Sequence, residues 1–121
     1  MAVELYKGES ERVVVSHVDE NAAAIDHSDI TNAKYILKHE DGTVLLKYAK
    51  VAESGFTTLT QEASAGKYSF EVTEAQSRTW NPGKVILEWW IQVVDANFSD
   101  GRKSMDEYHL FDIKASELST L

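Results

Sequence analysis

The sequence contains no cysteine and only one proline among its 121 residues. Without cysteine, disulfide bonds, thiolate nucleophiles and cysteine-ligated zinc sites are excluded, so packing and hydrogen bonds have to stabilise the fold. No apolar run approaches the roughly 20 residues that a membrane-spanning helix needs. The first residues also lack the basic and then apolar order of a signal peptide. We therefore expect a protein that is made and kept in a cytosol and has no membrane partner.

Basic residues are also scarce, because 12 lysines and arginines stand against 20 aspartates and glutamates and give a formal net charge of −8. They are scattered singly, and Arg102-Lys103 is the only adjacent pair. A nucleic-acid-binding surface needs clustered lysine and arginine to neutralise phosphates. Anionic membranes would also repel an acidic protein. The charge therefore predicts that neither nucleic acid nor membrane is a partner.

The chain does have apolar residues that alternate with polar ones over short segments separated by turn residues. The hydrophobic share of 43% is normal for a globular protein, and the length suits a single domain over residues 1–121. The segments with strand-like alternation are 3–6, 13–15, 34–38, 44–48, 56–59, 68–72, 84–94 and 108–113. Together they predict an all-β fold: an immunoglobulin-like antiparallel β-sandwich of about seven strands with one short helical turn.

Two local motifs fix parts of this pattern. Asp41-Gly42 lies between two apolar runs, and its glycine suits the positive φ of a tight hairpin turn. The stretch Thr73-Glu74-Ala75-Gln76 has the form of a capping box and predicts a short helix that ends before Asn81-Pro82-Gly83. Residues 19–32 are the least regular part: residues 22–25 could form a helical turn, whereas Asp26, Ser28 and Asp29 indicate a loop.

The longest expected strand, 84–94, is apolar on both faces. Its core-facing residues are predicted to pack with Tyr68, Phe70, Phe111 and Ile113, and they are Val85, Leu87, Trp89, Ile91 and Val93. The opposite face carries Ile86, Trp90 and Val94 beside Glu88 and Gln92. An outer sheet face is normally polar, so something has to cover these three apolar residues. They form the candidate interaction surface, and either the segment 19–32 or another subunit covers it.

Residues with catalytic or metal-binding chemistry form no recognisable constellation. The four histidines lack metal-ligand spacing: His39 is expected in solvent at a hairpin tip, and His109 is expected to pack on the same face as Phe111. The loop 95–101 places its glycine seventh, whereas a calcium-binding EF-hand loop needs it sixth. No nucleophile elbow or phosphate-binding loop occurs. The sequence therefore predicts no enzyme activity, no cofactor and no metal.

The second half of the chain has a longer pattern, Thr73-x-x-x-Ser77-x-x-Trp80-x-Pro82-Gly83-x-Val85-x-Leu87-x-Trp89-x-Ile91-x-Val93, followed by an Asp-Gly loop and a last strand. With the Lys-Tyr-Ile-Leu hairpin on Asp41-Gly42, it resembles the N-terminal β-sandwich modules of siphophage upper baseplate proteins and related small phage tail proteins. The resemblance spans roughly residues 28 to 114. The chain stops where upper baseplate proteins continue into a longer region, so a stand-alone virion accessory protein fits this resemblance better.

Two functions follow as expectations. The first is a non-enzymatic structural or assembly protein of a bacteriophage particle, which would contact other virion proteins or further copies of itself and would be assembled in the host cytoplasm. The second is a ligand-binding sandwich. Its most plausible ligand would be a carbohydrate, bound by Trp90 or Trp80, because aromatic faces and carboxylates such as Glu88 are common sugar contacts.

Overall fold

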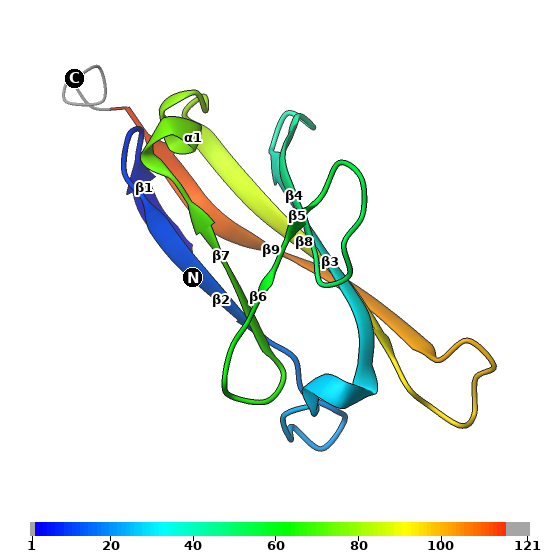
Figure 1. Cartoon of the computed structure of the whole chain (residues 1–121). Coiled ribbons are helices and arrows are strands. Elements are labelled where there is room, and N and C mark those ends of the chain that lie inside the picture. Colours follow the sequence, from blue (N-terminus) through cyan, green and yellow to red (C-terminus); the bar gives the residue numbers. More distant parts are fainter. Residues whose placement is uncertain (1, 116–121) are drawn as a thin grey trace.

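The alternating apolar residues of the chain are buried between two β-sheets that face each other (Figure 1). The computed structural model describes residues 2–115. In spatial order, the strands of the large sheet are β1 (Val3–Tyr6), β9 (Arg102–Lys114), β8 (Gly83–Val93), β3 (Ile30–His39), β4 (Val44–Ala49) and β5 (Thr57–Thr58). Those of the small sheet are β2 (Glu11–Ser16), β7 (Lys67–Val72) and β6 (Thr60–Gln61). The predicted all-β sandwich is therefore confirmed.

Apart from β1, which lies beside β9 in the large sheet, the strand order matches that of an immunoglobulin variable-type sandwich. Most neighbouring strands are antiparallel, but β1 pairs with β9 and β4 pairs with β5 in parallel. The expected strand at 56–59 is two short strands, because the chain crosses from the large sheet to the small one at the buried Leu59. With this division, the described residues form nine strands, whereas about seven were predicted.

The core lies between the sheets and is rich in aromatic side chains. Tyr35 and Tyr68 have no exposed surface, and the Phe70 ring stacks on Tyr48 at a centroid distance of 4.5 Å. The predicted core residues are confirmed as buried, except that Trp89 and Val93 are half-buried and pack against the core from its margin. In antibody domains a disulfide with a tryptophan packed on it fills this centre. Here aromatic rings fill it.

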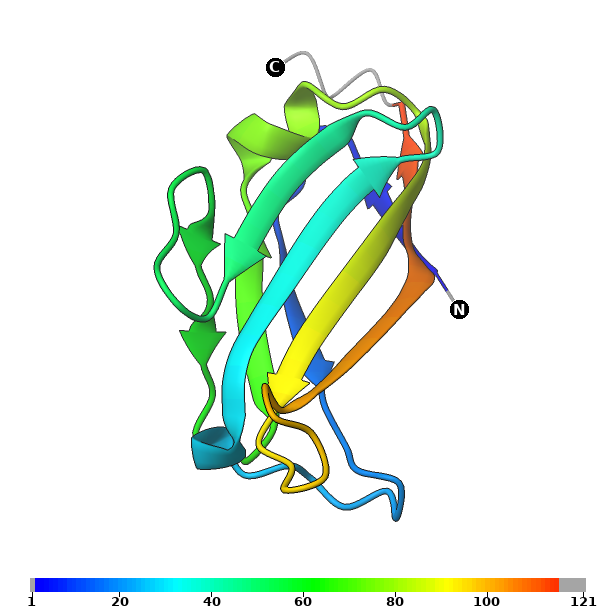
Figure 2. The same ribbon diagram turned by 90° about the vertical axis from the view of Figure 1, so that its right-hand side faces the viewer.

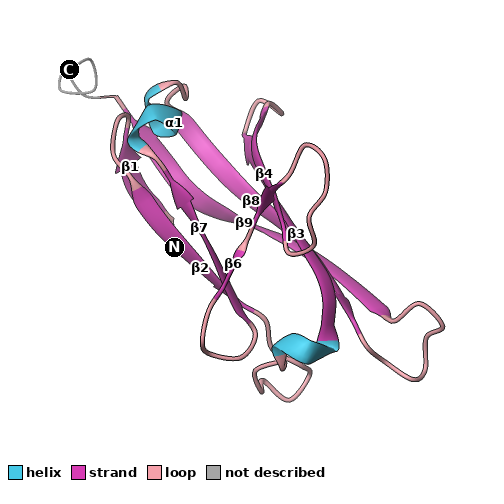
Figure 3. Cartoon of the chain, viewed as in Figure 1, coloured by secondary structure: helices cyan, strands magenta, loops and turns pink. Residues whose placement is uncertain are grey.

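Helical structure in the described residues is limited to two short turns, η1 (His27–Asp29) and α1 (Glu74–Arg78) (Figure 3). The predicted capping box at the start of α1 is confirmed. The Thr73 hydroxyl accepts a hydrogen bond from the Gln76 N–H, and the Gln76 side-chain oxygen accepts one from the Thr73 N–H. The buried Ser77 hydroxyl donates to the Glu9 carbonyl at 2.6 Å and accepts from Gly8 N–H at 3.0 Å. Helix α1 thereby holds the turn between β1 and β2. None of the helices in residues 2–115 is long and apolar enough to cross a membrane.

Strand β9 begins at Arg102, well before the predicted start at Tyr108. It pairs with β8 along most of its length, and one residue, Leu110, is an unpaired bulge between His109 and Phe111. Strand β1 pairs only with the last part of β9, from Phe111 to Lys114. Figure 2 shows β9 (orange) at the margin of the large sheet, with β1 (dark blue) beside only its end.

Candidate interaction surface

The outer face of the large sheet carries a row of large side chains from three neighbouring strands. The register places Lys34 of β3 opposite Trp90 of β8, and Trp90 opposite Met105 of β9. Side chains on β8 alternate between the two faces of the sheet, and Trp90 points outward because Trp89 and Ile91 on either side of it face the core. Met105 is 72% exposed, the largest exposed fraction of any large apolar side chain described.

A shallow groove of about 290 Å³ lies over this row. Besides Trp89, its apolar lining residues come from β3, β8, β9 and the connection between β4 and β5, and they are Ile36, Trp90, Met105 and Phe56. Among the described residues that line the groove, Phe56 alone does not belong to a strand of the sheet. It is brought there because its segment folds back alongside β4 before β5 begins. The groove is therefore an apolar concavity on a sheet face that is usually polar.

Charged side chains at the groove are paired with one another. The Lys34 ammonium lies 3.0 Å from Glu53 and also faces the rings of Phe56 and Trp90, at 5.4 and 5.7 Å from their centroids. On the other side, Lys38 lies 2.8 Å from Glu88 and 3.5 Å from Glu107. The hydrogen bond and negative charge of Glu88 raise the pKa of Lys38. The groove thus has apolar residues at its floor and charged residues at its rim, and these charged residues form ion pairs with one another.

The three residues predicted as an interaction surface do not lie in one site. Trp90 lies in the groove, and Ile86 is half-buried farther along β8, opposite Lys38 and His109. Val94 is 64% exposed beyond the end of β8 and borders a different cleft. The segment 19–32 borders that cleft with Val94 and does not line the groove around Trp90.

The second cleft has a volume of about 280 Å³ and lies at the end of the sandwich, between the β2–β3 and β8–β9 connections. Its apolar residues include Val18 and Ile25, and its rim carries Asp19, Asp26, Asp29 and Asp95. Several of these carboxylates already accept main-chain hydrogen bonds in turns: Asp26 from Ser28 and Asp95 from Asn97, both at 2.9 Å. Within residues 2–115, no group of three or more histidine, aspartate or glutamate side chains is placed to hold a metal ion.

Polar side chains inside the sandwich form a histidine–tyrosine cluster. A hydrogen bond of 2.5 Å joins His17 Nε2 to the Tyr35 hydroxyl, and burial lowers the pKa of His17 to about 4. His27 donates from Nε2 to the Glu62 carbonyl at 2.8 Å, so its Nδ1 can accept from the Tyr68 hydroxyl at 3.1 Å. Every buried side-chain nitrogen and oxygen among the described residues has a hydrogen-bond partner. The polar atoms of the cluster are therefore satisfied by hydrogen bonds within the chain.

Two histidine predictions were wrong. His39 is 7% exposed, because the turn at Asn81-Pro82 folds over it and places both carbonyls 3.2 Å from His39 Nε2. His109 does not share a face with Phe111, because the bulge at Leu110 reverses the alternation between them. His109 instead points outward and lies 2.9 Å from Asp112.

Of the two tryptophans considered as sugar contacts, Trp80 is 4% exposed and belongs to the core. The turn after α1 is itself exposed at Thr79, Asn81 and Pro82, and Trp80 is its one residue that is directed into the core. Sequence reasoning did not find Phe56 or Met105, since neither lies in a motif and only the strand register brings them beside Trp90.

No protein-family model matches the chain, and no curated protein is significantly similar to it in sequence.

Proposed function

We propose that the chain is a non-enzymatic assembly protein and that the groove around Trp90 is its contact with a neighbouring subunit. The observation that carries this proposal is the open apolar groove of Ile36, Phe56, Trp90 and Met105 on the outer sheet face. Contiguous exposed apolar surface on a protein usually marks an interaction site. Tryptophan and methionine are enriched in the centres of protein interfaces, where a polar rim surrounds them. The ion-paired rim of this groove has that form.

We further propose that the assembly is a bacteriophage particle, in which the chain is a tail, baseplate or neck accessory protein that contacts itself or other virion proteins. The support is the resemblance of residues 28 to 114 to siphophage baseplate modules, given above. A repeated virion subunit needs self-complementary surfaces and no active site. Assembly in a bacterial cytoplasm suits a chain without cysteine. The net charge of −8 would keep free subunits apart until they meet a specific neighbour.

A carbohydrate-binding function is the second candidate, and the same groove would serve it. Trp90 offers an aromatic face, and Glu88 and Lys34 offer polar groups at its margin. These polar groups are poorly suited to bind sugar hydroxyls, because Glu88 forms an ion pair with Lys38 and Lys34 forms one with Glu53. A sugar hydroxyl would have to compete with both ion pairs. This competition makes the protein contact the better-supported function.

Size-exclusion chromatography with light scattering tests the proposal. Wild-type protein at high concentration should form an assembly, and Trp90→Glu should shift it to a smaller species with an unchanged circular-dichroism spectrum. The matched control is Val14→Glu, which places the same charge on an exposed position of β2, on the small sheet. Unchanged assembly in Trp90→Glu would refute the contact. Sugar binding by a wild-type monomer, lost in Trp90→Glu, would favour the second function.

A further inference from the structure

Strand β9 has a free edge along most of its length. One side of it pairs with β8 from Arg102 onward, whereas the other side pairs with β1 only from Phe111 to Lys114. Within the described part of the chain, no strand pairs with residues 102–110 on that second side. A free strand edge presents unpaired N–H and C=O groups and is a template for pairing with another strand. Residues 102–110 of β9 are therefore available to pair with a strand of another molecule.

The direction of the main-chain groups can be read from the neighbouring bonds. Val94 N–H donates to the Asp29 carbonyl, on the β3 side of β8. Because the direction alternates along a strand, the odd-numbered residues of β8 face β9, and their partners in β9 are even-numbered. The N–H and C=O groups of Lys103, Met105 and Glu107 consequently face the free edge. The side chains of these three residues lie on the outer face, like that of Trp90.

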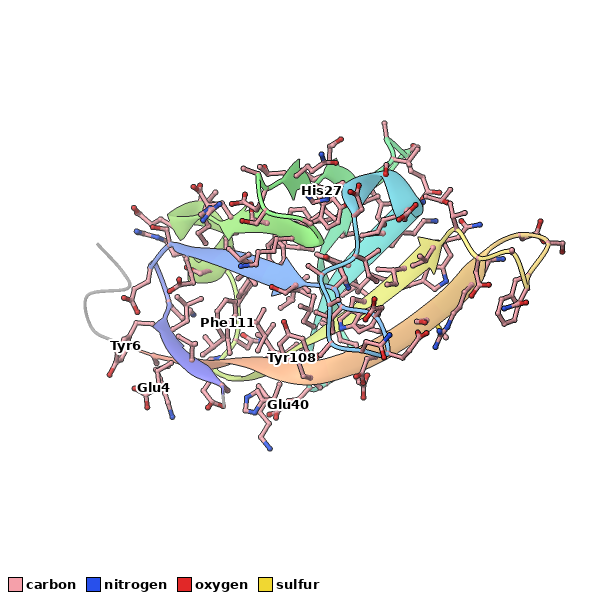
Figure 4. All side chains as sticks on the ribbon, turned by 90° about the horizontal axis from the view of Figure 1, so that it is seen from below. Glu4, Tyr6, His27, Glu40, Tyr108 and Phe111 are labelled. Atoms are coloured by element: carbon pink, nitrogen blue, oxygen red, sulfur yellow. The ribbon has the colours of Figure 1, made fainter. Side chains whose placement is uncertain are left out.

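The side chains along the edge are complementary to themselves. If a second copy pairs antiparallel with Met105 opposite Met105, then Lys103 of each copy lies opposite Glu107 of the other. All these residues lie on the same outer face, which a continuous sheet requires. On the inner face, Arg102 would lie opposite Tyr108, a pair that permits a cation–π contact. Figure 4 shows Tyr108 pointing from β9 toward the space between the sheets, and it is 41% exposed.

We propose that β9 pairs edge to edge with β9 of a second copy, antiparallel, across a two-fold axis at Met105. The pairing would join the two large sheets and the two Trp90 grooves into one apolar stripe, since Met105 is the neighbour of Trp90 in each copy. The inference goes beyond the proposed function, because it specifies the partner, the strand and the register. It does not depend on what occupies the groove.

One feature of the edge limits the strength of this pairing. The Glu107 N–H donates to the Asp106 carboxylate at 2.8 Å, so this amide is satisfied in the single copy. Charged residues on an edge strand are a common protection against unspecific pairing. In the proposed register the Asp106 carboxylate lies opposite the Ser104 hydroxyl of the second copy, which can donate to it. The charged edge residues therefore disfavour pairing with strands of other sequence more than they disfavour pairing with β9 of a second copy.

Charge reversal with mixing tests the register. Lys103→Glu alone and Glu107→Lys alone each place like charges opposite one another twice, and each should weaken two-copy association at least tenfold in analytical ultracentrifugation. An equimolar mixture of the two variants restores both opposite pairs, so it should form a one-to-one heterodimer with nearly wild-type affinity. The control Lys84→Glu, on an exposed position of β8, should associate like wild type.

The mixing experiment shows whether the effect of the variants comes from an ion pair between two copies or from an ion pair within one copy. Glu107 also contacts Lys38 of its own chain at 3.5 Å, and mixing cannot repair that contact. A mixture that stays monomeric, single variants that assemble like wild type, or a wild-type protein that is monomeric at millimolar concentration would each overturn the proposal.

The chain has no cysteine, so Met105→Cys gives a second readout: oxidation should yield a disulfide-linked dimer far faster than it does for Val14→Cys.

Trp90→Glu distinguishes this inference from the proposed function. If both hold, Trp90→Glu loses the larger assembly and keeps the two-copy species, whereas Lys103→Glu loses the two-copy species. If the groove is not a contact but the edge is, Trp90→Glu assembles like wild type and the mixing experiment still restores the heterodimer. If only the groove is a contact, Trp90→Glu is monomeric and mixing restores nothing.

Discussion

Two adjacent tryptophans on β8 face opposite sides of the large sheet and should respond differently to truncation. Trp89 packs against the core, with its ring 5.0 Å from that of His17, so Trp89→Ala should lower the free energy of unfolding by about 3 kcal/mol. Trp90 lies in the open groove, and Trp90→Ala should cost about 1 kcal/mol or less. Urea denaturation of both variants measures the difference. Equal losses would show that the inward and outward faces of β8 are assigned wrongly.

The buried His17 should make stability depend on pH. Burial lowers the pKa of His17 to about 4 from the ordinary 6.5, so the unfolded chain binds this proton more readily than the folded one. Stability is therefore complete above pH 6.5 and falls as the pH drops toward 4, by at most roughly 3 kcal/mol. His17→Gln can still bond to Tyr35 but does not titrate. Its unfolding free energy should fall less than that of wild type between pH 7 and 4.5; parallel curves would contradict this assignment.

At the scale of elements, the turn between β6 and β7 depends on a glycine. Gly66 has a φ of +71°, and a Cβ there would lie 2.5 Å from the His17 carbonyl oxygen. Gly42, in the β3–β4 turn, has a φ of +95° with nothing within 4 Å of such a Cβ. Gly42→Ala should cost only the left-handed strain of about 1–2 kcal/mol, and Gly66→Ala roughly 4 kcal/mol or more. Thermal melts of the two variants compare them directly, and similar melting temperatures would refute the close approach at Gly66.

The elements that could be predicted from the sequence are those with strong apolar alternation. The long strand expected at 84–94 is β8, Gly83–Val93, and the capping box at Thr73 begins α1. The first half of β9 could not be found, because residues 102–107 lie on a solvent-facing edge and show no apolar periodicity. Alternation predicted that Trp90 points outward. It could not predict Phe56 or Met105 beside it, since that depends on strand register and on a loop.

For the whole molecule, we expect the packing of the apolar core between the two sheets to stabilise the fold without a bound ion. The loop 95–101 resembles a calcium loop only in composition, and its Asp95 already accepts the Asn97 N–H at 2.9 Å. We expect EDTA to leave the melting temperature unchanged, and added calcium to raise it by no more than about 1 °C. A drop of several degrees in EDTA, restored by calcium, would identify the loop as a metal site.

Association should depend on salt in a way set by the charge of the whole chain. Two copies that each carry a net charge of −8 repel one another, and the Debye length of about 30 Å at 0.01 M salt lets most of their charges interact. At 0.15 M the Debye length is about 8 Å, so this repulsion is largely screened, while a close pair such as Lys103 and Glu107 is screened much less. Raising salt across this range should therefore strengthen association, by about tenfold if the repulsion is worth near 1.4 kcal/mol. Sedimentation equilibrium at both salt concentrations measures the change. Association that is strongest at 0.01 M would mean that attraction between opposite patches outweighs the net charge, and that the acidic surface does not keep free subunits apart.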